Sequence, residues 1–197
     1  MSTYLYDEAL VEKLRNWTKN TQVKVFSPDD TKRLIETIAD ESNDSPVELP
    51  IICLRRKTGL NIINPNKRPL TYDGLTLEAN PDTSLQLNAI PIDVQYQLDI
   101  YTRYFKEADE FLRNIIFNII NYPKLTIKVP CDSLDIEHDG YIRMTNNVDD
   151  NSSIPERLIP GQFTRLTCNV YIDDAYLWNA KVRTNYRIVD AEVAVED

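Results

Sequence analysis

Apolar and polar residues alternate without a break from Ile92 to Thr102, and this pattern constrains the fold more than any other feature of the chain. A period of two is typical of a β-strand that buries one face and exposes the other. The apolar positions are Ile92, Val94, Tyr96, Leu98, Ile100 and Thr102, and the polar positions are Asp93, Gln95, Gln97, Asp99 and Tyr101. We therefore predict one long strand whose polar face is either a solvent face or a contact with another subunit.

A helix is predicted directly after this strand, over residues 106–122, because its apolar residues recur at helical spacing and Pro123 ends the pattern. The predicted apolar stripe contains Ala108, Phe111, Leu112, Ile115, Ile116, Ile119 and Ile120, while Phe117 lies off its centre. Residues 125–129 form the next predicted strand, an order that would permit a right-handed parallel crossover. The polar face of the long strand disfavours a parallel sheet covered on both sides. We therefore predict an α+β fold, a mixed, largely antiparallel sheet with helices packed on one face.

The N-terminal region, over about residues 1–45, is predicted to be mainly helical. Apolar spacing predicts a helix over residues 4–20, followed by a short strand over 22–26. Ser27 then starts a second helix, because a serine hydroxyl caps the first free amides of a helix. Residues 49–54 are almost continuously apolar, which predicts a strand covered on both faces, with residues 59–63 as its hairpin partner.

Two segments rich in turn-forming residues interrupt the predicted strands, an irregular arm over residues 64–83 and a polar loop over residues 146–162. The arm is either a surface loop or a segment that becomes ordered against a neighbouring subunit. Further strands are predicted over residues 164–172 and 175–188, joined by a turn at Asp173 and Asp174. No clear boundary divides the chain, so we predict that residues 1–197 form a single α/β domain.

The charge of the chain argues against some functions. Its formal net charge is −9, whereas a protein that binds nucleic acid through phosphates normally presents a basic face. An acidic surface can still line a channel through which DNA passes without binding. The apolar runs are too short to span a bilayer, and acidic residues near the start do not fit a secretion signal. Three widely spaced cysteines, Cys53, Cys131 and Cys168, fit reduced core thiols of a protein made in the cytoplasm.

The sequence contains no pattern that predicts catalysis. His138 is the one histidine, within the acidic stretch 135–139, and we favour a solvated turn there over a metal site because consecutive residues point to opposite faces. We interpret Asp149 and Asp150 as turn residues rather than an acid/base pair. The four isolated glycines form no phosphate-binding loop. We therefore predict no enzyme, no cofactor and no metal; the alternative is a hydrolase or nuclease with an unrecognised site.

Contact with other subunits is the remaining function that the residues favour. The chain has 11 tyrosines and 2 tryptophans, and tyrosine offers a large rigid contact area with one polar end. The alternative is that most of these rings are half-buried packing residues. The predicted interface residues are Asp93, Gln95, Gln97, Asp99 and Tyr101 on the long strand, Tyr72 in the arm, and Asp149, Asp150, Arg157 and Gln162 in the loop.

Two long stretches resemble structural proteins of tailed bacteriophages. The stretch IPIDVQYQLDIYTRYFKEADEFLRNIIFNIINYPKLTIKVP, residues 90–130, is similar to a segment in which a long strand precedes a helix that opens with Glu-Ala-Asp. The stretch DDNSSIPERLIPGQFTRLTCNVYIDDAYLW, residues 149–178, is similar in the same way. The resemblance is to tail completion or tail terminator proteins, which take part in head-tail joining, and to their neck relatives.

This resemblance implies a small α/β subunit that forms a ring, commonly sixfold, which caps the tail tube and joins it to the neck. The implied partners are copies of the chain, the tail tube and neck or connector proteins, with no membrane. The implied location is the virion tail or neck after synthesis in the host cytoplasm, and DNA would pass through the assembly without specific binding. A neck connector or a baseplate component of the same virion is the alternative. A ring requires two different patches that meet between copies.

Overall fold

The computed structural model describes residues 3–18, 23–39, 48–57, 61–63, 70–76, 83–131, 134–153 and 163–184. Its strands are β1 (Lys24–Phe26), β2 (Ile51–Arg56), β3 (Asn61–Ile62), β4 (Leu70–Thr76), β5 (Thr83–Thr102), β6 (Lys124–Cys131), β7 (Leu134–Asp150) and β8 (Thr164–Thr184). They form one mixed sheet in the order β1-β2-β5-β8-β7-β6, with β3 and β4 also paired to β5. Only β1 and β2 pair in parallel among these strands. The predicted α+β fold class is therefore confirmed.

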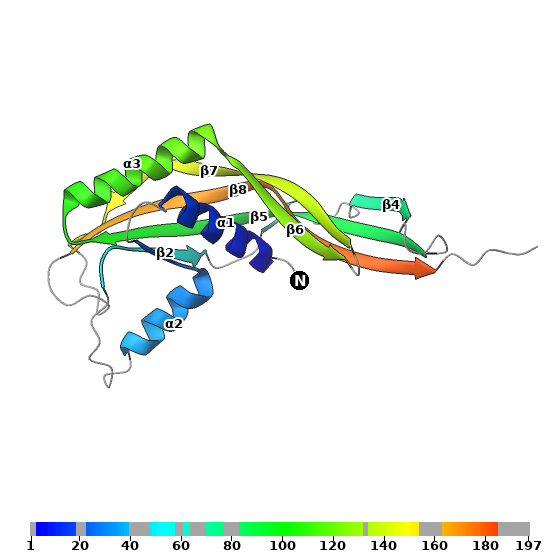
Figure 1. The fold of residues 1–197 in the computed structure, drawn as a ribbon, viewed down its shortest axis with the longest axis horizontal. Coiled ribbons are helices and arrows are strands. Elements are labelled where there is room, and N and C mark those ends of the chain that lie inside the picture. The colour runs from blue at the N-terminus through cyan, green and yellow to red at the C-terminus, as the bar shows by residue number, and fades with distance from the viewer. Residues whose placement is uncertain are drawn as a thin grey trace, which may run out of the picture.

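The predicted long strand is confirmed as part of β5, which lies in the middle of the sheet. It pairs with β8 along its whole length, from Thr83 opposite Thr184 to Thr102 opposite Thr164. Twenty residues of strand extend about 65 Å at roughly 3.3 Å per residue. The two strands therefore set the long axis of the molecule, and their distal ends project to the right in Figure 1, alongside β4.

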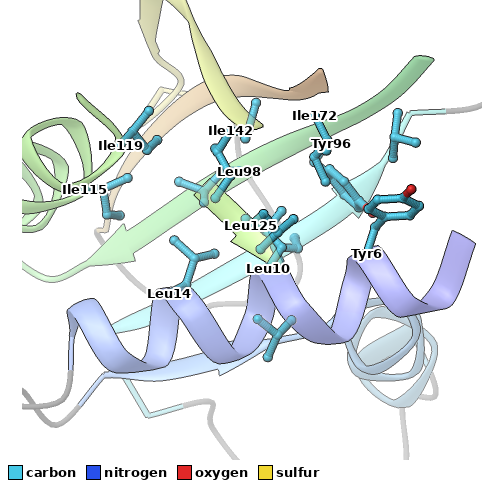
Figure 2. Close-up of a cluster of buried hydrophobic side chains, with 14 of the residues drawn as sticks. Tyr6, Leu10, Leu14, Tyr96, Leu98, Ile115, Ile119, Leu125, Ile142 and Ile172 are labelled. Atoms are coloured by element: carbon cyan, nitrogen blue, oxygen red, sulfur yellow. The ribbon is translucent and has the colours of Figure 1, made fainter. Parts of the chain in front are cut away.

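Two helices cover one face of this sheet, α1 (Thr3–Trp17) and α3 (Phe105–Asn121). Figure 2 shows Leu10 and Leu14 of α1 pointing toward the sheet, with Ile115 and Ile119 of α3 beside them. These side chains and the apolar residues of β5 form one buried cluster. Each fully buried aliphatic side chain contributes about 1.5–3 kcal/mol to folding. None of the described helices is long and apolar enough to cross a membrane.

A third helix, α2 (Pro28–Ala39), packs on the opposite face. Its Leu34 lies against a second buried cluster made of Ile51, Cys53 and Tyr101. The prediction that the helices pack on one face is therefore wrong for α2, because β2 is apolar on both sides and needs a cover on each. The predicted start of this helix is confirmed, since the Ser27 Oγ accepts a hydrogen bond from the backbone amide of Asp30 at 3.1 Å.

The predicted turn at Asp173 and Asp174 is wrong, because β8 continues through both residues. Asp174 has a φ of 58°, so the strand bends there without reversing. β7 pairs with β8 only as far as Tyr141 opposite Asp173, and the hairpin of β6 and β7 then separates from β8. Long strands absorb such bends at local irregularities, and sequence alone reads the same polar pair as a turn.

Other boundaries also differ from the predictions. Residues 61–62 pair with β5 and not with β2, so the predicted hairpin is wrong. A regular strand, β4, occupies part of the predicted irregular arm, and β7 continues to Asp150, five residues into the predicted loop. Residues 64–69, 77–82 and 154–162 lie outside the described part of the chain.

Candidate functional site

The predicted polar face of β5 is exposed at only one end. Asp93 is exposed, and Gln95 and Gln97 are half-buried. Asp99 and Tyr101 are completely buried, so the prediction of a polar contact face is wrong at these two positions. They are covered because β2 and β8 flank this end of β5 and α2 packs over it.

Asp99 is the centre of a buried polar network that joins three strands. One oxygen, Oδ1, accepts from the Arg165 Nη2 at 3.1 Å and from the Thr167 Oγ1 at 2.7 Å. The other, Oδ2, lies 3.3 Å from the Arg55 Nε. Both oxygens of this buried carboxylate are thus committed to neighbouring strands. We assign Asp99 to the sheet structure and not to a reactive centre.

The structure brings together only some of the other predicted interface residues. Asp149 stands opposite Thr167, which stands opposite Asp99, so the three form one cross-strand row. Asp150 follows at the end of β7, where hydrogen bonds from Ser152 lower the pKa of its exposed carboxyl. Tyr72 pairs with Leu87 on the distal half of β5, about 40 Å along the strand from Asp99. Arg157 and Gln162 lie outside the described residues.

A second buried carboxylate, Asp7 of α1, was not singled out from the sequence. The Tyr96 hydroxyl donates to the Asp7 Oδ1 at 2.6 Å, and Arg56 forms an ion pair with the other oxygen. Burial raises the pKa of Asp7, although Tyr96 and Arg56 oppose that shift. The sequence does contain a signal for this buried carboxylate. Asp7 stands at helical spacing before Leu10 and Leu14, so it interrupts the apolar stripe of the helix.

His138 lies on β7 and not in the predicted turn. Its Nε2 is 2.7 Å from the backbone oxygen of Asp174, and its ring makes edge contacts with Tyr176 and Trp178. The ring therefore packs the hairpin against the bent part of β8. Within the described ranges, no group of three or more His, Cys, Asp or Glu side chains is arranged to hold a metal ion.

Exposed large hydrophobic side chains are concentrated around α3. Among the described residues, six of the nine exposed large hydrophobic side chains lie on this helix or beside it. They are Tyr104, Phe105, Phe117, Ile120, Tyr122 and Tyr141, and we call them the α3 surface. Ile120 is 69% exposed, so its predicted place in the buried stripe is wrong. Apolar side chains gathered in this way commonly mark a binding site.

A groove of about 670 Å³ runs between the C-terminal half of α3 and β7. Its apolar wall is formed by Ile116, Ile119, Ile120, Pro123, Met144 and Val148, and we call it the α3–β7 groove. It begins where α3 ends and β6 starts, because Pro123 turns the chain there. Together with the α3 surface, this groove is the candidate functional site.

Comparisons of this chain with protein-family models and with the curated proteins found no match.

Proposed function

We propose that this chain is a structural subunit that assembles with copies of itself into a ring at the end of a phage tail tube. The observation that carries the self-assembly is the concentration of exposed apolar side chains around α3. Burying such side chains against another protein removes apolar surface from water, which is the main favourable term in association. The phage tail as the place of assembly is supported by the resemblance of residues 90–130 and 149–178.

The shape of the molecule supports a head-to-tail arrangement of copies. Helix α3 lies over one half of the long sheet, and the distal ends of β5 and β8 project from the other half (Figure 1). Two different patches on different halves of the molecule favour a heterologous interface, which closes into a ring when the rotation between copies permits. The ring would stop the growth of the tail tube and offer a surface to neck or connector proteins.

Immunogold electron microscopy of the virions that contain this chain tests the proposal. We expect label at the junction between the tail tube and the head, on particles that retain their tails. Label at the baseplate would move the subunit to the other end of the virion. Intact virions that carry no label, although the antibody recognises the unfolded chain on a blot, would overturn the proposal.

A further inference from the structure

Beside the α3–β7 groove, one edge of β7 has no partner among the described strands. The pairing of β6 with β7 ends at Lys124 opposite Tyr141, and the next amide, that of Ile142, donates to the Pro123 oxygen at 2.7 Å. Backbone groups of alternate residues in a strand point to the same side, so Met144 presents its N–H and C=O in that same direction. Among the described strands, only β8 pairs with β7 beyond this point.

A bulge interrupts this edge between Met144 and Val148. Met144 stands opposite Val170 and Val148 stands opposite Cys168, so three residues of β7 lie where β8 has one. The Asn151 amide donates to the Arg165 oxygen at 2.9 Å, which is the β8 side. Backbone groups alternate in direction along a strand, so those of Val148, three residues before Asn151, face away from β8, as those of Met144 do. An incoming strand therefore meets outward donors and acceptors on both sides of the bulge.

The α3–β7 groove and the exposed Asp149 beside it define which segment would fit. An added strand places alternate side chains on opposite faces of the sheet. One set would lie against Ile116 and Ile120 in the apolar groove, and the other would lie on the face of the exposed carboxylate of Asp149. The fitting segment is thus an extended one in which apolar residues alternate with basic ones.

The distal end of β8 has this chemistry. Residues 179–184 read NAKVRT, in which Ala180 and Val182 alternate with Lys181 and Arg183. β7 has already separated from β8 at Asp173, so the described strands pair with residues 179–184 only through β5. Among the described strands, β8 therefore has one unpaired edge at its distal end, which projects beyond the half of the sheet that α3 covers (Figure 1).

From these observations we propose that the α3–β7 groove receives residues 179–184 of a second copy as an added strand on β7. The proposal rests on the self-assembly proposed above and names the two patches that meet. Sheet continuation from copy to copy would give each contact a fixed register, because backbone hydrogen bonds align the strands while the groove selects the side chains. Each copy donates at one end and accepts at the other, as a ring requires.

Directed disulfide formation tests which parts of two copies meet. One variant carries Asp149→Cys and the other carries Lys181→Cys, both with Cys131→Ser. Cys53 and Cys168 stay in place because both thiols are buried. After mixing and mild oxidation, we expect a disulfide-linked dimer in at least about ten-fold excess over a control mixture, since a specific contact raises the effective concentration of the two thiols. The control replaces Asp149→Cys by Asp29→Cys, an exposed position on α2.

A second pair of variants tests the added strand itself. Met144→Pro removes the outward N–H without removing a hydrogen bond to β8, and edge strands tolerate proline in this orientation. Met144→Ala shortens the same side chain and keeps the N–H. We expect Met144→Pro to reduce the cross-linked yield about ten-fold relative to Met144→Ala, with both variants folded by circular dichroism.

Sedimentation of the wild-type chain separates the possible failures. If copies associate but the control mixture cross-links equally well, the groove contact is overturned and the ring proposal stands. The same conclusion follows if copies associate but Met144→Pro and Met144→Ala give equal cross-linked yields. Absence of both association and cross-linking over the whole concentration series would overturn both proposals. Cross-linking of Asp149→Cys in virions to a different protein, in place of a second copy, would also overturn the groove contact.

Discussion

Asp99 and Asp7 lie on opposite faces of the sheet, and each keeps a buried carboxylate beside an arginine. Arg165 is itself buried, so removing Asp99 would leave a buried charge that lacks its carboxylate, which costs more than the pair contributes when intact. These two residues therefore fix how strands and helices meet at this end of the molecule. They are positions at which a single substitution has a large effect.

The substitution Asp99→Ala is expected to lower the free energy of unfolding by about 3–5 kcal/mol, because Arg165 would stay buried without its partner. Urea denaturation followed by circular dichroism measures this change. The control is Asp93→Ala on the same strand, where the side chain is exposed and the expected change is within about 0.5 kcal/mol. Equal losses for both variants would show that the buried network contributes no special stability.

The pH dependence of stability should reveal Asp7. Its pKa is raised in the folded state, chiefly by burial, so the folded protein binds this proton more tightly than the unfolded chain does. The corresponding stability is fully present below the ordinary carboxyl pKa of about 4 and is lost as the pH rises through the folded value. We therefore expect wild type to lose stability relative to Asp7→Asn as the pH is raised from about 3 to 7.

Unfolding free energies of both proteins at a series of pH values check this expectation. Glu8→Gln is the matched control, because Glu8 is the next residue of α1 and is exposed. Its difference from wild type should change little with pH. A constant difference between wild type and Asp7→Asn would contradict the raised pKa.

At the scale of elements, the bend of β8 and the separation of the β6–β7 hairpin depend on the close approach of Gly140 on β7 to Ile172 and Asp173 on β8. A Cβ atom placed on Gly140 would lie 3.1 Å from the Ile172 Cγ2 and 3.2 Å from the backbone oxygen of Asp173. A larger residue would push the hairpin away from β8 at the point where the two separate. The glycine thus permits β7 to lie on β8 and then to leave it.

Gly140→Ala is accordingly expected to destabilise the protein by about 1–3 kcal/mol, the usual cost of forcing extra atoms into a packed site. Thermal unfolding measures the loss, and Lys128→Ala, an exposed change on β6 of the same hairpin, should leave the unfolding temperature nearly unchanged. If the two variants melt together, the contact at Gly140 is not a constraint on the fold.

At the scale of the whole molecule, some apolar residues of α3 pack in the core and others are exposed on the surface. Ile115 is completely buried against the sheet, whereas Ile120 is 69% exposed. A protein that worked alone would gain solubility from a polar residue at such an exposed position. The retained isoleucine fits a contact that forms when copies assemble.

This division predicts opposite effects for the same chemical change. Ile115→Ala should destabilise the subunit by about 2–5 kcal/mol, whereas Ile120→Ala should change stability by less than about 0.5 kcal/mol. Ile120→Ala should instead weaken self-association, measured by sedimentation over a concentration series, because the apolar contact area is lost. An unchanged association constant for Ile120→Ala would place the interface elsewhere.

Local patterns predicted much of the fold. The alternation within β5, the apolar stripe of α3 and the cap at Ser27 are each set by residues a few positions apart, and all three agree with the structure. The candidate site was much harder to predict. Asp93, Gln95, Gln97, Asp99 and Tyr101 share one period-two pattern, yet their exposure falls from one end to the other.

The sequence by itself determined the helices, the long strand and the mixed sheet, because those preferences arise within one turn or one strand, but it did not determine β4 or the continuation of β7 and β8 through polar residues. Only the tertiary structure decided which faces are covered. Strands distant in sequence bury Asp99 and Tyr101. Because β6 begins only at Lys124, opposite Tyr141, no described strand pairs with the outward edge of β7 at Met144 and Val148. Burial depends on neighbours brought together by the whole chain, so an exposed isoleucine such as Ile120 reads in sequence like a core residue.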